Sequence, residues 1–193
     1  MAIETRSIEP VDQETLLGLG RRALTSAAGG GPIPSADDAQ LTDELRAPLA
    51  AFVTLTVRGE LRGCIGRLDP GRPLWQNVLE AAVGAAVGDP RFPPVKPDEV
   101  GDIRLEISVL SPAVEIADPD RFEPGVHGII VEQGPTRGLL LPQVAQEYGW
   151  GRRQMLEAAC WKAGLPRDAW RDLATRLFVF TASVFAELER DAT

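Results

Sequence analysis

The stretch Asp102-Ile103-Arg104-Leu105-Glu106-Ile107-Ser108-Val109-Leu110-Ser111 carries the clearest β-strand pattern in the chain. Apolar and polar side chains alternate through it, and successive side chains of a strand point to opposite faces. One face is therefore aliphatic, whereas the other carries Arg104, Glu106 and Ser108. Such alternation predicts a strand with one face buried against a core, as is typical of an antiparallel sheet.

A β-hairpin is predicted before this strand. Residues 51–57 alternate in the same way, the Arg-Gly-Glu sequence of residues 58–60 supplies a turn, and residues 61–66 return. A two-residue turn at either position within 58–60 sets Cys64 opposite Val53 or Leu55. Because both of those residues belong to the apolar face, we expect Cys64 to share it.

The rest of the chain mixes helices and strands without a regular strand–helix–strand rhythm, which predicts an α+β fold. Apolar stripes at helical spacing indicate helices, and short runs bounded by glycine and proline indicate strands. The expected helices are residues 11–28, 73–87, 142–148 and 152–163, and the expected second hairpin is residues 128–132 and 137–141. The last strand, residues 177–188, is apolar on both faces and is expected inside the main sheet.

Composition narrows the class of protein. A length of 193 residues suits one domain, and a formal net charge of -8 disfavours binding to nucleic acid or to an anionic membrane surface. Two cysteines and one histidine are too few for a disulfide framework or a four-ligand zinc site, so no metal is expected. Residues 1–10 lack the apolar core of a signal peptide, and no run of about 18 apolar residues occurs. We therefore expect a cytoplasmic protein.

Arg62 and Cys64 form the sharpest local feature. Period-two geometry places both side chains on one face of the return strand, about 7 Å apart. One interpretation is a reactive thiolate, because a neighbouring cation lowers the pKa of a thiol. The other is a small buried cysteine, the usual fate of a free cysteine. An arginine on an apolar face is costly unless it is paired, and Glu106 is the partner that we expect.

Other candidate residues lie in loops and at strand ends. His127 sits between glycines at the start of a predicted strand, where backbone groups can approach closely. Asp89 and Arg91 flank Pro90 in an extended loop that exposes both charges. The structural alternatives are a hydrogen-bonded histidine and an ion pair that fixes the loop. Cys160 lies on an apolar helical stripe and is expected in the core.

The sequence Leu61-Arg62-Gly63-Cys64-Ile65-Gly66 is the hallmark of the AMMECR family, which this chain resembles. Further segments resemble family motifs in the same order: residues 89–94, 105–111, 125–129, 141–144 with 149–150, and 162–164. Six motifs in register are far more specific than any one of them. The resemblance covers roughly residues 11–188 of the chain.

The resemblance implies a mostly antiparallel central sheet flanked by helices, with a smaller lobe around residues 112–172 and a cleft between the two. It further implies that the chain is the protein A component of the AmmeMemoRadiSam system. The other named components of that system are a Memo-type protein and a radical SAM enzyme. The resemblance attaches no reaction and no cofactor to the chain.

Two functions stay open at this point. The chain is either a cysteine-dependent enzyme for a small anionic substrate or a non-catalytic module that binds a ligand or a partner. In the enzyme, Cys64 is the nucleophile, His127 the base and Glu106 an orienting or binding group. The expected ligand-binding residues are Arg62, Asp89, Arg91 and Ser108. We expect Arg62, Cys64, Glu106 and His127 to share one pocket, with Arg91 at its rim.

Overall fold

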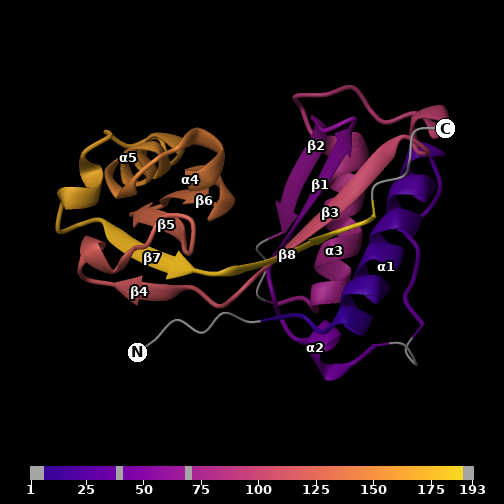
Figure 1. The fold of residues 1–193 in the computed structure, drawn as a ribbon, viewed down its shortest axis with the longest axis horizontal. Helices are drawn as coiled ribbons and strands as arrows, with labels where there is room; N and C mark the ends of the chain where they lie inside the picture. The colour runs from indigo at the N-terminus through magenta and orange to yellow at the C-terminus, as the bar shows by residue number, and fades with distance from the viewer. Residues whose placement is uncertain (1–6, 38–40, 68–70, 189–193) are drawn as a thin grey trace. The chain divides into compact units, whose positions relative to one another are not determined.

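The computed structural model describes residues 7–37, 41–67 and 71–188. These residues form two compact units (Figure 1). The first unit contains residues 7–110 and 183–188, and the second contains residues 111–182. Each unit holds one four-stranded sheet, and helices accompany both sheets, so the predicted α+β class is confirmed. None of the described helices is long and apolar enough to cross a membrane.

The first unit is built on a sheet with the strand order β2-β1-β3-β8. Its strands are β1 (Ala51–Val57), β2 (Glu60–Arg67), β3 (Ile103–Leu110) and β8 (Ala182–Ala186). Its helices are α1 (Pro10–Ala28), α2 (Asp43–Arg46) and α3 (Leu74–Val83). The hairpin β1–β2 and the strand β3 appear where the alternation predicts them, whereas the short helix α2 is not among the predicted helices.

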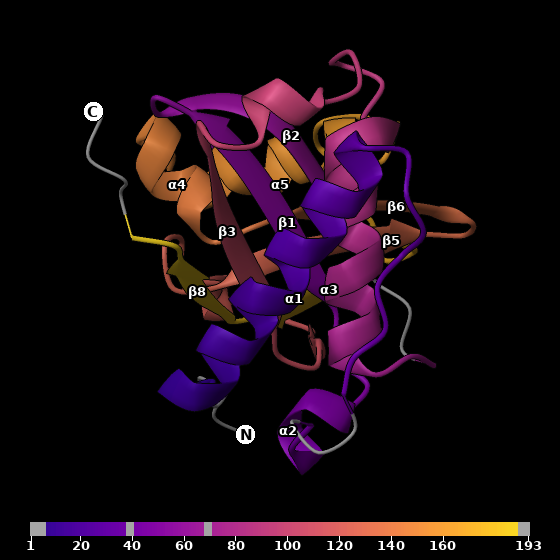
Figure 2. The same cartoon turned by 90° about the vertical axis from the view of Figure 1, so that its right-hand side faces the viewer.

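Helices α1 and α3 lie side by side on one face of this sheet (Figure 2). Proline at the first position of α1 suits a helix start, because that position needs no intrahelical N–H donor. Leu16 and Leu24 of α1 are fully buried, as are Val53, Leu55 and Leu105 on the facing side of the sheet. The aliphatic face of the alternating strands is therefore the core of the first unit.

The chain leaves α3 through a π-helical segment, Gly84–Gly88. The predicted helix of residues 73–87 thus ends its α-helical part at Val83, and five residues continue with wider turns. Gly63 of β2 packs against this segment so closely that a Cβ there would lie 2.1 Å from the carbonyl oxygen of Ala85. The segment leads directly into Asp89 and so fixes where that side chain meets β2.

The second unit has the strand order β4-β7-β5-β6. Its strands are β4 (Val114–Ile116), β5 (Gly128–Gln133), β6 (Thr136–Leu140) and β7 (Arg176–Phe180), and its helices are α4 (Gln143–Tyr148) and α5 (Arg152–Lys162). Cys160 of α5 is fully buried in the core of this unit, as its apolar stripe predicts. The short strand β4 has no counterpart in the sequence-based expectations.

The prediction of one strand over residues 177–188 inside the main sheet is wrong. The segment forms two strands: β7 is an internal strand of the second sheet, and β8 is the edge strand beside β3 in the first. Thr181 lies between them, and its N–H donates to Oγ of Ser111 while its carbonyl accepts the N–H of Ser111. The alternation runs on through the switch with no glycine or proline to mark it, so the pattern does not reveal that the sheet changes.

Candidate functional site

Cys64 lies on the face of the first sheet opposite to the aliphatic core. It pairs with Thr54 of β1, and Thr54 pairs in turn with Glu106 of β3, so the three residues form one row across three strands. The expectation that Cys64 faces Val53 or Leu55 is wrong. Cys64 instead shares a face with Glu106, and its thiol is half-buried.

A β-bulge in the hairpin causes this change of face. Leu55 pairs with Gly63 and Thr56 pairs with Leu61, so Arg62 is the extra residue. One inserted residue shifts the pairing by one and moves every following side chain of the strand to the other face. The prediction that Arg62 and Cys64 share one face also assumed a regular strand. That assumption fails at the bulge, where Arg62 is the extra residue.

The backbone of Cys64 is held by side chains of the loop that follows the π-helical segment. Its N–H donates to Oδ2 of Asp89 at 2.9 Å, and its carbonyl accepts from Nη2 of Arg91 at 3.3 Å. Strand β2 is an edge of its sheet, so these groups replace the backbone partners that a neighbouring strand would supply. The thiol itself accepts a hydrogen bond from Oγ1 of Thr54, with 3.3 Å between oxygen and sulfur.

Asp89 and Arg91 form a two-pronged ion pair. Nε of Arg91 donates to Oδ1 at 3.0 Å and Nη2 donates to Oδ2 at 2.7 Å. The Asp89 side chain is only 2% exposed, whereas that of Arg91 is 55% exposed. The hydrogen bond from Arg91, aided by the N–H groups of Cys64 and Arg91, holds the pKa of Asp89 well below its usual range. The same bond raises the pKa of Arg91.

Arg62 is paired with Glu99, not with Glu106 as expected. Its Nε and Nη2 donate to the two carboxylate oxygens of Glu99 at 3.1 and 3.2 Å, and Nη1 donates to the carbonyl of Pro93 at 2.9 Å. The Arg62 side chain is 13% exposed. Its hydrogen bond to Glu99 lowers the pKa of that carboxyl. Arg62 therefore anchors the segment between the loop and β3, a role that needs no ligand.

Glu106 and Ser108 lie on the same face as Cys64. Glu106 is half-buried, Ser108 is buried, and both already have interaction partners in the protein. Phe52 pairs with both Ser108 and Gly66, and a Cβ at Gly66 would lie 2.2 Å from the Phe52 ring. The polar face, defined here as Thr54, Cys64, Glu106 and Ser108, is thus bordered by an aromatic ring. Thr54 was not among the predicted site residues, although its place on the polar side of an alternating strand could have indicated it.

His127 belongs to the second unit, at the entry to β5. It is 8% exposed, and its Nδ1 accepts the backbone N–H of Glu123 at 3.2 Å. That hydrogen bond occupies the lone pair of Nδ1. The preceding Gly125 adopts a positive φ of 85°, a conformation that suits glycine and forms the turn before the histidine.

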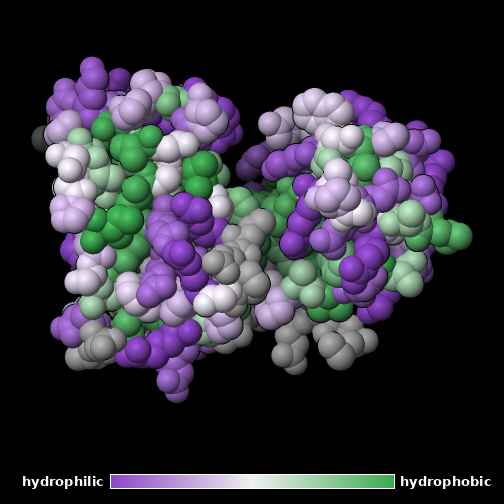
Figure 3. All heavy atoms as spheres, turned by 180° about the vertical axis from the view of Figure 1, so that it is seen from behind, coloured by the Kyte–Doolittle hydropathy of each residue, from purple (hydrophilic) through white to green (hydrophobic). Residues whose placement is uncertain are grey.

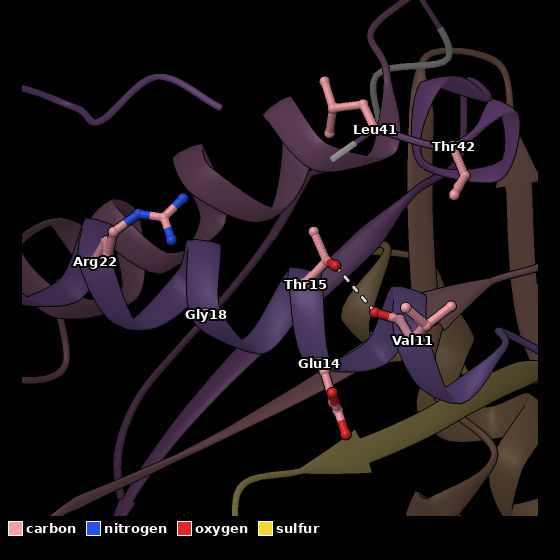
Figure 4. A pocket seen from close by; sticks show the side chains of 7 residues that line it. All are labelled: Val11, Glu14, Thr15, Gly18, Arg22, Leu41 and Thr42. Carbon is pink, nitrogen blue, oxygen red and sulfur yellow. Dashed lines mark hydrogen bonds between the residues drawn. The ribbon is translucent and has the colours of Figure 1, made fainter. Parts of the chain in front are cut away.

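A shallow groove beside α1 is a further hollow in the first unit (Figure 4), with a volume of about 600 Å³. Its lining residues are Val11, Glu14, Thr15, Gly18, Arg22, Leu41 and Thr42. The hydroxyl of Thr15 donates a hydrogen bond to the carbonyl of Val11, and the carboxylate of Glu14 points away from Leu41 and Thr42. Because its polar groups do not converge, this groove is a weaker candidate than the polar face.

The outer surface of the described residues carries both apolar and polar side chains. Figure 3 shows green apolar patches on each unit, bordered by purple polar side chains. Large exposed hydrophobic residues include Ile33 and Val87 in the first unit and Trp161 in the second. Within the described part of the chain, no group of three or more histidine, cysteine, aspartate or glutamate residues could hold a metal ion.

The chain belongs to the AMMECR1 family, whose pattern matches residues 17–185. A protein of Methanothermobacter thermautotrophicus is 46% identical over 179 residues, covering 90% of this chain and 93% of that protein. Protein PF1979 of Pyrococcus furiosus is 44% identical over 185 residues, covering 90% of this chain and 87% of that protein. The crystal structure of the uncharacterised protein PH0010 of Pyrococcus horikoshii matches with a TM-score of 0.83, at 42% identity over 90% of both chains. The resemblance to the AMMECR family is thus confirmed, while the reaction stays open.

Proposed function

We propose that the chain is a cysteine-dependent enzyme for a small anionic substrate, with Cys64 as its nucleophile. The observation that carries this proposal is the β-bulge, which takes the thiol out of the aliphatic core and sets it on the polar face. A cysteine opposite Val53 or Leu55 would be an inert core residue. A half-buried cysteine whose sulfur accepts a hydroxyl hydrogen bond, and whose backbone is held by an arginine–carboxylate pair, has the surroundings of a reactive one.

The chemistry requires a thiolate, a group that handles protons and donors for developing negative charge. The Thr54 hydroxyl already donates to the sulfur and would stabilise its negative charge. Glu106 lies two strands away on the same face, about 10 Å from Cys64 between backbones, with Thr54 between the two in the row. We assign the proton-handling role to Glu106. The free thiols are in keeping with a reducing compartment such as the cytoplasm.

Alkylation with iodoacetamide as a function of pH tests the nucleophile. Cys64 should react in the folded protein, and faster near neutral pH than a model thiol. Cys160 should react only after unfolding, because burial raises the pKa of its thiol and removes it from solvent. The variant Cys160→Ala isolates the Cys64 signal. A Cys64 that is alkylated only in denaturant would remove the basis of the proposal.

The second candidate function is a non-catalytic binding module, in which the chain acts as protein A of the AmmeMemoRadiSam system beside a Memo-type protein and a radical SAM enzyme. It is favoured by the Asp89–Arg91 pair next to Cys64, because a fixed arginine is typical of recognition. Capture of metabolites by the wild type and by Cys64→Ser separates the two functions. An enzyme should release a changed product that the variant does not form, whereas a binding module should return the same unchanged ligand from both proteins.

A further inference from the structure

The guanidinium of Arg91 is fixed in place although it is exposed. Asp89 binds its Nε and Nη2, and the carbonyl of Cys64 accepts a second bond from Nη2. The guanidinium carbon also lies 5.5 Å from the centroid of the Phe92 ring. An arginine normally loses considerable side-chain freedom when it binds a ligand, and here much of that loss has already occurred on folding.

One edge of this guanidinium remains open. Within the described residues, Nη1 of Arg91 has no hydrogen-bond partner, and the side chain is 55% exposed. Arg62 is the contrasting case, because all three of its nitrogens donate to Glu99 or Pro93 and its side chain is 13% exposed. Of these two arginines in the predicted site, only Arg91 presents a donor to a ligand.

The charge balance limits what Arg91 can recognise. Asp89 neutralises the charge of Arg91, so the pair does not attract an anion through a net positive charge. What the pair offers is a directed N–H donor, and a charge-assisted hydrogen bond from such a donor suits one oxygen of an oxyanion. The open donor belongs to the same guanidinium that contacts the carbonyl of Cys64. The open donor therefore lies beside the backbone of the residue that carries the proposed nucleophile.

We propose that Arg91 recognises the oxyanion group, a carboxylate or a phosphate, of a small substrate whose electrophilic carbon lies next to that group. Asp89 is the positioning residue that aims the guanidinium. This inference rests on the proposed function, because it takes Cys64 as the attacking group. It assigns recognition to Arg91 and removes Arg62 from the set of ligand-binding candidates.

Iodoacetate and iodoacetamide form a matched pair of probes, since they differ in carrying a carboxylate or a neutral amide beside the reacting carbon. With either probe the thiol first loses its proton to solvent. The sulfur then forms a bond to the CH2 carbon, and iodide leaves with the electron pair of the C–I bond. The ratio of the two alkylation rates at Cys64, divided by the same ratio for free cysteine, measures preference for the anion.

For the protein with Cys160→Ala, this normalised ratio should exceed one. Arg91→Gln should lower it about threefold to fivefold, the size expected for one partly exposed charge-assisted hydrogen bond. Arg67→Gln is the matched control: Arg67 lies at the end of the same strand, is partly exposed, and its loss removes the same net charge. Arg67→Gln should leave the ratio unchanged. Arg91→Lys keeps the charge without the planar fork, so its ratio should lie between those of Arg67→Gln and Arg91→Gln.

A measurement on the protein that retains Arg91 keeps the inference testable even if the Arg91 variants fail to fold. Inorganic phosphate should slow alkylation by iodoacetamide, and sodium chloride at equal ionic strength should not. If Cys64 reacts with iodoacetamide but shows neither anion preference nor phosphate protection, the inference about Arg91 is overturned while the proposed nucleophile stands. If Cys64 reacts with neither probe in the folded protein, the proposed function itself fails. An equal fall of the ratio in Arg91→Gln and Arg67→Gln would reduce the effect to net charge and also overturn the inference.

Discussion

The two units each contain an arginine–carboxylate fork of nearly the same geometry in very different surroundings. In the first unit, Arg91 donates to Asp89 at 3.0 and 2.7 Å. In the second, Arg176 donates to Glu115 at 3.0 and 2.8 Å. The Asp89 side chain is 2% exposed, whereas that of Glu115 is 50% exposed. The distances alone would give the two pairs equal weight, and their burial shows that they have different roles.

The buried fork does more than pair two charges. Asp89 also accepts the backbone N–H groups of Cys64 and Arg91, so removing it leaves two partly buried donors without partners. The exposed fork joins neighbouring strands β4 and β7 at a place where water can replace either partner. A surface pair of that kind contributes little to stability, while loss of a buried acceptor carries the full cost of desolvation.

The largest effect is expected from Asp89→Ala. It should lower the free energy of unfolding by about 2 kcal/mol, since two N–H donors lose their acceptor and the guanidinium loses its partner. Urea unfolding followed by circular dichroism would measure this loss. Asp89→Asn keeps an acceptor for the N–H of Cys64 and should cost less, about 1 kcal/mol. Equal stability of the alanine variant and the wild type would contradict the role given to this carboxylate.

Acid should erase the difference between the wild type and Asp89→Asn. The folded-state pKa of Asp89 lies below its unfolded value, so its contribution is complete above the unfolded pKa of about 4 and is lost as pH falls through the folded pKa. The wild type should therefore be more stable at about pH 7, and the gap should narrow steadily below about pH 4. All other carboxylates are the same in both proteins, so a gap that does not change with pH would speak against a paired, ionised Asp89.

Thr54→Val tests the contact on the polar face itself. Valine keeps the shape of threonine but has no hydroxyl to donate to the sulfur of Cys64. Alkylation of Cys64 near neutral pH should slow by about twofold to threefold, because the thiolate loses a stabilising donor. Thr54→Ser retains the hydroxyl and should stay near the wild-type rate. If the valine and serine variants react alike, the hydrogen bond has no influence on the thiol.

The smallest effect is expected from Glu115→Gln. This change removes the charge of the exposed fork while keeping its shape. The urea midpoint of the protein should not shift measurably, at low or at high salt. A loss of stability as large as that of Asp89→Asn would show that geometry, and not burial, decides the strength of these forks.

The strands and helices were largely predictable because each depends on short-range periodicity. The alternation of residues 102–111 gave β3, and the Arg-Gly-Glu turn gave the hairpin β1–β2. The switch of the last segment between two sheets was not predictable, since β7 and β8 share one uninterrupted alternation. The candidate residues Cys64, Glu106 and Ser108 do lie on one sheet face, but for a reason that the sequence pattern did not contain.

The sequence by itself determined the fold class, the family and the chemical groups available to the site. Only the tertiary structure decided which of those groups are free to act. A bulge of one residue carried Cys64 from the expected core face to the polar face. Glu99, a residue with no motif of its own, took Arg62 out of the site, and Asp89 fixed Arg91 with one edge open. Periodicity describes neighbours along the chain, whereas register and ion pairing depend on residues that folding brings together from distant positions.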